Sequence, residues 1–145
     1  MAALSMWSRP VAPEDPGAVA AAHVFPQEVI VFIAYAVVGI LLAVALTGSA
    51  VGTFTRQEKI VGSMLGLGVP ESWLPRLATL KSAGAVGLVV GLWVPLLGVA
   101  AAIGVVLYFI GAAVTHLRAK DYAIAPVVVL FLLAVAALVL RLASA

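Results

Sequence analysis

The stretch SAGAVGLVVGLWVPLLGVAAAIGVVLYFIGAAVTHL, residues 82–117, contains 36 residues and no formal charge. As one helix it would be about 54 Å long at 1.5 Å per residue, whereas the core of a bilayer is about 30 Å thick. A proline inside a helix removes a backbone hydrogen bond and breaks the helix. The segment Pro95-Leu-Leu-Gly98 therefore predicts a tight hairpin between two membrane-spanning helices, at about 76–94 and 99–117.

The composition of the whole chain also indicates a membrane protein. Of 145 residues, 65% are hydrophobic and 10% are charged, and the mean hydropathy is +1.24. Soluble domains average about 45–50% apolar and 25% charged residues. The net charge of +2 provides no strongly basic face for nucleic acid, and the absence of cysteine excludes thiol chemistry. We expect an integral protein of the lipid bilayer that does not bind nucleic acid.

Two further runs without charge are long enough to cross a bilayer. The run between Glu28 and Arg56 predicts a helix at about 29–47, and the run from Tyr122 to Leu140 predicts one at about 122–141. Residues 1–27 contain four prolines and early acidic residues, which favours an extended or disordered tail over a cleaved signal. The predicted fold is therefore all-α, an integral membrane four-helix bundle over residues 28–145.

A short amphipathic helix is predicted between the first and second membrane helices. The segment Thr55-Arg-Gln-Glu58 has the spacing of a capping box, which starts a helix. Ile60 and Met64 continue at helical spacing before glycines and a proline interrupt the pattern. Such a helix is expected to lie in the membrane interface, with Glu58 and Lys59 toward the head groups or the mouth of the bundle.

The loop charges predict the orientation of the chain. Positively charged loops stay in the cytoplasm, so we expect both termini outside the cell. The predicted inner side carries Arg56, Lys59, Arg76, Lys81, Arg118 and Lys120, and the outer side carries only Arg9 and Arg141.

An even number of crossings brings several polar side chains to one membrane face. Lys81 near the start of the second helix and His116 near the end of the third would lie there, together with Glu58 and Lys59. Tyr108 would lie about two turns deeper. Cationic donors can bind carbonyl oxygens while apolar helices hold a hydrocarbon tail, which predicts a pocket for a quinone or similar lipid. The alternative is that these charges only anchor the helices, and the sequence leaves both interpretations open.

Other chemistries lack the residues they need. One histidine in the membrane region cannot hold a haem from both sides. No set of His, Asp and Glu residues has the spacing of metal ligands. No Ser/His/Asp arrangement and no phosphate-binding glycine loop is present. We expect no metal site, and the sequence leaves open whether the chain is an enzyme.

Glycines recur at positions where helices can pack closely. The pattern Gly87-x-x-x-Gly91 allows another backbone to approach. If such faces dock on other proteins, the chain would be a non-catalytic structural or assembly subunit of a larger membrane complex, or a homo-oligomer. The residues predicted to pack are Gly39, Gly84, Gly87, Gly91 and Gly111.

Several segments together resemble the DoxX-like family. They are KIVGS (59–63), LGVPES (67–72), LKSAGAVGL (80–88), PLLG (95–98) and LYFIGAAVTHLRAKD (107–121). The resemblance covers about residues 29–142 and implies a compact four-helix membrane bundle. The family takes its name from a subunit of a thiosulfate:quinone oxidoreductase, which implies a redox-linked membrane subunit.

Many relatives have a glutamate at the position of Lys81. The alanine-rich composition resembles that of bacterial members, which implies the cell membrane of a bacterium.

Overall fold

The computed structural model describes residues 15–145, with side chains described for residues 15–20 and 27–145. This part of the chain is helical and contains no strand, which confirms the all-α class. Its elements are α1 (Pro16–Phe54), α2 (Glu58–Gly66), the short 3-10 helix η2 (Glu71–Trp73), α3 (Leu74–Val90), α4 (Pro95–Arg118) and α5 (Ala125–Ala143).

Three segments are long and apolar enough to cross a membrane. They are Gln27–Phe54 within α1, Pro95–Arg118 and Ala125–Ala143. α3 has 17 residues and follows η2 without a break. These helices support the predicted membrane location of the protein.

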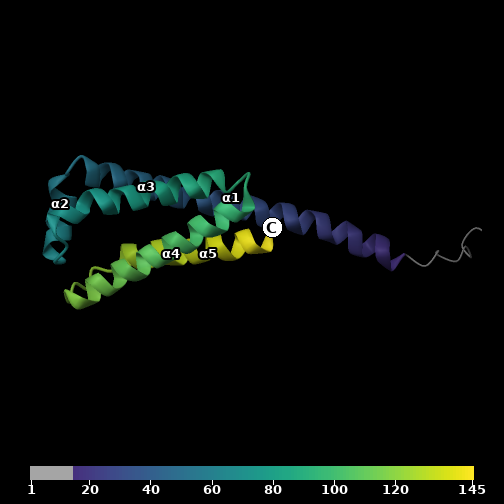
Figure 1. Ribbon diagram of the computed structural model, residues 1–145. Helices are drawn as coiled ribbons and strands as arrows, with labels where there is room; N and C mark the ends of the chain where they lie inside the picture. Colours follow the sequence, from purple (N-terminus) through teal and green to yellow (C-terminus); the bar gives the residue numbers. More distant parts are fainter. Residues whose placement is uncertain (1–14) are drawn as a thin grey trace, which may run out of the picture.

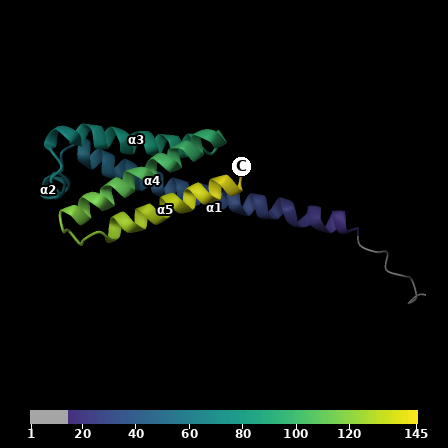
Figure 2. The same ribbon diagram turned by 60° about the horizontal axis from the view of Figure 1, so that its bottom comes forward.

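The four longer helices pack in a ring. α1 contacts α3 and α5, and α4 contacts the same two helices. The pair α1–α3 and the pair α4–α5 lie close together at the α3–α4 turn and diverge toward α2 (Figures 1 and 2). The bundle is therefore closed at one end and open at the end that carries α2.

Apolar side chains fill the centre of the ring. Small residues on α4 and α5 let the helices approach, and larger side chains of α1, α3 and α4 fill the space between them. Large apolar side chains also lie exposed on the outer faces, which suits contact with lipid. The buried cluster contains Tyr35, Leu42, Ala43, Leu46, Ala85, Leu88, Ala102, Val105, Phe109, Ala134 and Ala137.

The closed end depends on a contact between two glycines. A Cβ on Gly91 would lie 2.2 Å from the Cα of Gly98 and 2.8 Å from the hydroxyl of Tyr35. Tyr35 donates a hydrogen bond of 3.2 Å to the carbonyl of Leu88. Backbone of α3, backbone of α4 and a buried tyrosine of α1 therefore meet at one point.

The turn between α3 and α4 lies earlier than predicted. It comprises residues 91–94, and Pro95 is already in the first turn of α4. Proline is tolerated there because the first N–H groups of a helix have no partner within the helix. The prediction that Pro95-Leu-Leu-Gly98 forms the turn is thus wrong, although a sharp reversal between these two helices is present.

α1 is longer than the sequence predicted. It begins at Pro16, and the carboxylate of Asp15 accepts a 3.0 Å hydrogen bond from the N–H of Gly17. An acidic cap followed by proline is a strong start for a helix. Residues 16–27 are therefore helical rather than extended, and α1 projects beyond the other helices (Figure 1). The rest of the predicted tail, residues 1–14, lies outside the described residues.

α2 is present, but the capping box is not. α1 continues to Phe54, and the hydroxyl of Thr55 donates back to the carbonyl of Val51 at 2.8 Å. α2 starts after Gln57, which makes no side-chain capping bond. Ile60 packs on Gly52 of α1, where a Cβ would lie 2.3 Å from its Cδ1 atom. The position of α2 in a membrane interface stays a prediction.

Gly91→Ala should lower the free energy of unfolding by about 1–3 kcal/mol, because an added methyl overpacks a backbone contact. Thermal unfolding in mild detergent, followed by circular dichroism, measures the change. Gly48→Ala is the matched control, since a Cβ on Gly48 meets no atom within 4 Å. It should leave stability unchanged or raise it by up to about 1 kcal/mol. Equal midpoints for the two variants would contradict the role of the glycine contact.

Candidate functional site: a polar pocket at the open end of the bundle

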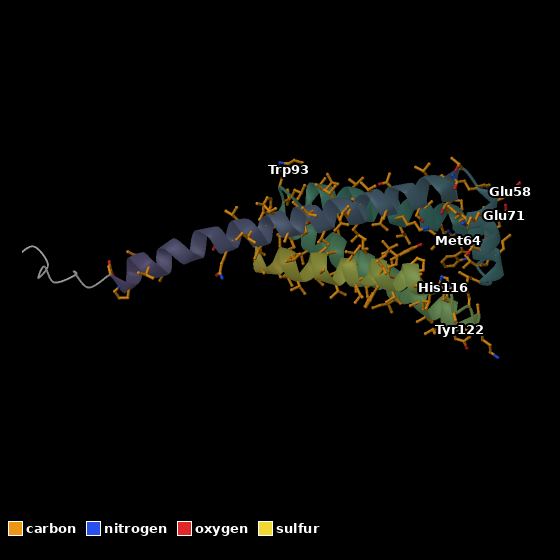
Figure 3. The ribbon with its side chains drawn as sticks, turned by 180° about the vertical axis from the view of Figure 1, so that it is seen from behind. Glu58, Met64, Glu71, Trp93, His116 and Tyr122 are labelled. Carbon is orange, nitrogen blue, oxygen red and sulfur yellow. The ribbon has the colours of Figure 1, made fainter. Side chains whose placement is uncertain are left out.

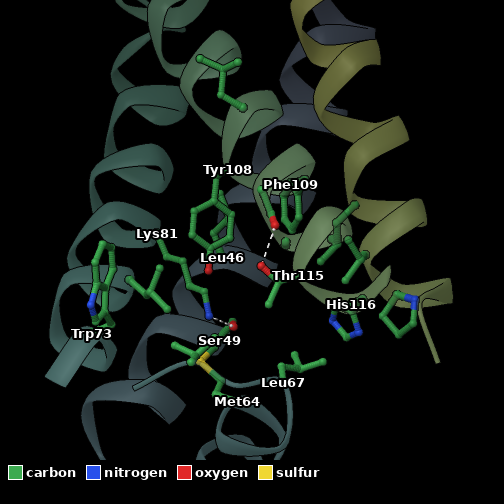
Figure 4. Close-up of a pocket in the computed structure, with 18 of the residues that line it drawn as sticks. Leu46, Ser49, Met64, Leu67, Trp73, Lys81, Tyr108, Phe109, Thr115 and His116 are labelled. Atoms are coloured by element: carbon green, nitrogen blue, oxygen red, sulfur yellow. Dashed lines mark hydrogen bonds between the residues drawn. The ribbon is translucent and has the colours of Figure 1, made fainter. Parts of the chain in front are cut away.

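A pocket of about 860 Å³ lies where the helix pairs diverge. Its polar side chains include Ser49 on α1, Lys81 on α3, and Tyr108, Thr115 and His116 on α4 (Figure 4), together with Arg118 at the end of α4. Met64 of α2 and His116 both lie at the open end (Figure 3). The apolar part of the wall includes Leu46, Leu67, Trp73, Leu77, Phe109 and Leu130.

Lys81 is held in the wall of this pocket. The residue is only 6% exposed. Its ammonium donates a 2.8 Å hydrogen bond to Ser49 and a longer one, of 3.5 Å, to Thr53. It also lies 5.9 Å from the centre of the Tyr108 ring, within the range of a cation–π contact. The charge is thus fixed beside the cavity by groups from α1 and α4 (Figure 4).

The ammonium of Lys81 has no carboxylate partner among the described side chains. The ion pairs in this part of the chain are Arg56–Glu71 and His116–Asp121. A buried charge without an opposite charge costs several kcal/mol. The ammonium has three N–H donors, and two of them reach hydroxyl oxygens. One donor remains for an acceptor in the pocket.

Tyr108 adds a second polar group to the same wall. Within the described residues its hydroxyl makes no hydrogen bond, and it points in the same direction as the Lys81 ammonium, toward the α2 end (Figure 4). Thr115 donates to the carbonyl of Gly111 at 2.8 Å, which leaves its oxygen able to accept. Polar groups on a few positions and apolar groups elsewhere are typical of a site for an amphipathic molecule.

His116 joins the pocket to the α4–α5 connection. Its Nδ1 atom lies 3.1 Å from Oδ2 of Asp121, whose other oxygen accepts a 3.1 Å bond from the N–H of Ala123. Lys120, between them, has a left-handed backbone with φ 56°. Asp121 therefore orients the imidazole of His116 and also holds the α4–α5 connection through the N–H of Ala123. His116 also lines the pocket.

The structure groups only some of the predicted ligand residues. Lys81, Tyr108 and His116 line one pocket. Glu58 and Lys59 are exposed in the first turn of α2 and do not line it. The contact of Ile60 with Gly52 explains this, because it turns the start of α2 with its apolar side toward α1 and its charged side outward.

Three of the predicted packing glycines face α4. A Cβ on Gly84 would meet Val105 at 2.8 Å, one on Gly87 would meet Ala101 at 2.6 Å, and Gly91 meets Gly98. A Cβ on Gly39 would meet only ring atoms of Tyr35 on its own helix, and one on Gly111 would meet no atom within 4 Å, so neither makes a close contact of this kind with a neighbouring helix. Gly111 instead lines the pocket, where the helices have already diverged.

The hydroxyl partners of Lys81, Ser49 and Thr53, were not predicted from the sequence. Ser49 and Thr53 are four residues apart on α1, so they lie on the same helix face. Polar residues at this spacing in an otherwise apolar helix indicate a face that meets a charge. That signal could have paired them with Lys81.

Arg141 was predicted only as a charge of the outer side, and the sequence did not indicate that it is buried. It is 3% exposed, and its guanidinium carbon lies 5.1 Å from the ring centre of Tyr35 and 5.8 Å from that of Phe32. One guanidinium nitrogen donates to Ser144 at 3.2 Å. The residue therefore belongs to the interior at the closed end, held by aromatic rings of α1.

A family model described as the DoxX-like family matches residues 37–139. The chain belongs to the DoxX-like family. The match contains every polar residue of the pocket, so the site lies within the family domain. Comparison with curated proteins returned no match, and neither did comparison with solved structures.

Lys81→Met should leave the thermal midpoint unchanged or raise it. Methionine keeps a flexible unbranched chain, and the change removes a buried charge that has no opposite charge. Leu88→Ala on the same helix provides the scale, because truncating this fully buried side chain should cost about 2–5 kcal/mol. A loss for Lys81→Met as large as that for Leu88→Ala would mean that the lysine is a structural residue.

Proposed function

We propose that this DoxX-like protein binds a quinone or a similar lipid in the pocket at the open end of its bundle, as a redox-linked membrane subunit. The observation that carries the proposal is the ammonium of Lys81, buried beside a cavity without a carboxylate among the described side chains. Ionisable residues in membrane helices are costly and usually serve a function.

The polar groups suit a head group with carbonyl oxygens. Lys81 offers an N–H donor and Tyr108 an O–H donor on one wall, and His116 lies nearer the mouth. A hydrogen bond to a charged donor stabilises a complex by about 1.5–3 kcal/mol, and more where water is excluded. A head group without acceptors would leave the ammonium unsatisfied, so the site discriminates in favour of a carbonyl or another acceptor.

A redox-linked role requires electrons from another subunit. Conversion of a quinone to a quinol takes up two electrons and two protons. The electrons would come from an electron-donating partner protein, and His116 at the mouth could exchange the protons with water. The redox part of the proposal rests on the family resemblance, whereas the binding part rests on the pocket.

In the proposed arrangement the membrane is crossed four times, by α1, α3, α4 and α5. α3 is added to the three long apolar segments, and α2 lies in the interface. Basic residues gather at the α2 end, and positively charged loops stay in the cytoplasm. The pocket would then open at the cytoplasmic face, with both termini on the other side. The residues at that end are Arg56, Lys59, Arg76, Arg118 and Lys120.

The alternative, a structural or assembly subunit, has less support. This alternative assumes that the glycine-lined helix faces are free to bind other proteins. Gly84, Gly87 and Gly91 instead pack against α4 within this chain, where a Cβ would lie less than 3 Å from the neighbouring helix. The lipid-binding role therefore explains more of the molecule.

Lys81→Met should weaken quinone binding about tenfold or more, the loss expected for one hydrogen bond to a charged donor. The full-length protein is purified in mild detergent, the quinone that it retains is extracted and quantified, and affinity is measured by quenching of tryptophan fluorescence, since Trp73 lines the pocket. His116→Ala should also reduce retention.

Lys59→Met is the matched control, because Lys59 lies near the same end but outside the pocket. It should bind quinone as the wild type does. Normal retention by Lys81→Met, or wild-type protein that binds no quinone, would refute the proposed function.

A further inference from the structure

A second cavity, of about 480 Å³, lies between α3 and α4. It shares four lining residues with the polar pocket: Leu46, Lys81, Leu107 and Tyr108. Both cavities therefore border the pair formed by the Lys81 ammonium and the Tyr108 ring. Lys81 and Tyr108 lie beside one another in the close-up (Figure 4).

The lining of the second cavity is almost entirely apolar. Apart from Lys81 and Tyr108, only alanine, glycine, leucine and valine line it. Leu80 and Leu107 stand at its edges and are 59% and 62% exposed on the outer face of the bundle. The outer face is apolar and suits lipid, so this cavity is a crevice that opens sideways into the hydrocarbon of a bilayer.

The helix geometry explains why the crevice exists. Near the closed end α3 and α4 touch, with Gly87 against Ala101 and Gly91 against Gly98. Further along, Gly84 still meets Val105, whereas Gly104 is exposed on the outer side and a Cβ there would meet no atom within 4 Å. The crevice therefore lies beside the line of contact between α3 and α4, where small side chains on both helices leave the space unfilled.

We infer that the crevice between α3 and α4 holds the hydrocarbon chain of the ligand whose head group lies in the polar pocket. This inference rests on the proposed function. A head group beside Lys81 and Tyr108 already borders the crevice, so a chain attached to it can pass between Leu80 and Leu107 into lipid. A chain that left through the α2 end would instead lie among charged residues such as Arg118.

This arrangement determines the class of ligand. The site takes a molecule with a hydrogen-bond acceptor at one end and a long apolar chain at the other, and it takes it from the membrane rather than from water. The chain length should contribute to affinity, because each methylene buried adds to the free energy of binding. A head group alone should bind more weakly.

Gly104→Leu tests the crevice directly. The new side chain fills the gap without a clash, because the Cβ position is open. Two probes are compared by quenching of tryptophan fluorescence in the full-length protein, namely a quinone with a long isoprenoid chain and the same ring without the chain. We expect the variant to bind the long-chain quinone about tenfold more weakly, as several methylenes lose their contacts, and to bind the ring as the wild type does.

Gly48→Leu is the matched control. Gly48 is also an exposed helix glycine with an open Cβ position, but it lines neither cavity. It should bind both probes normally. Ala83→Leu fills the crevice from the α3 side and should repeat the result if Gly104→Leu fails to fold, as loss of ring binding would reveal.

The outcomes separate the two proposals. If crevice variants that bind the ring also keep full affinity for the long-chain quinone, the inference is wrong while the proposed function stands. If the wild-type protein binds neither probe, the proposed function is wrong and the inference falls with it.

Discussion

The close approach of Gly91 and Gly98 is the constraint on which the rest of the bundle depends. It brings the backbones of α3 and α4 together at one end, where Tyr35 of α1 caps the contact and bonds to Leu88. Two straight helices that touch at one end and are inclined to each other separate toward the other end. A cavity remains there where side chains do not fill the space. The polar pocket lies at the end where the helix pairs have separated, and the lateral crevice lies beside α3 and α4 where small residues leave space.

The energetics of the open end differ from those of the closed end. In the buried cluster, apolar and aromatic groups pack together and favour the folded state. At the open end, the Lys81 ammonium contacts hydroxyl groups and the ring of Tyr108 but no carboxylate among the described side chains, which compensates poorly for the loss of its hydration. A residue that opposes stability and lines a cavity is better explained by binding than by folding.

The sequence predicted the helical class and the membrane location, because long charge-free runs permit few alternatives. The family was indicated by the order and spacing of several short segments. Local boundaries were misplaced where a short interaction competed with a pattern. Thr55 back-bonds to Val51 rather than capping α2, and Asp15 with Pro16 starts α1 in a segment judged extended. For the site, topology alone brought Lys81 near His116. The partners Ser49 and Thr53 required knowledge of which face of α1 meets α3.

The two buried cations of the described chain show why burial alone does not indicate a ligand site. Arg141 lies against the rings of Tyr35 and Phe32, donates to Ser144, and lines neither of the two cavities. Aromatic faces offset part of the cost of its burial, and the residue joins α5 to α1. Lys81 also lies near an aromatic ring, but it borders both cavities and keeps a donor free toward open space. The difference lies in the cavity, and that is the feature that favours a binding role for Lys81 and a packing role for Arg141.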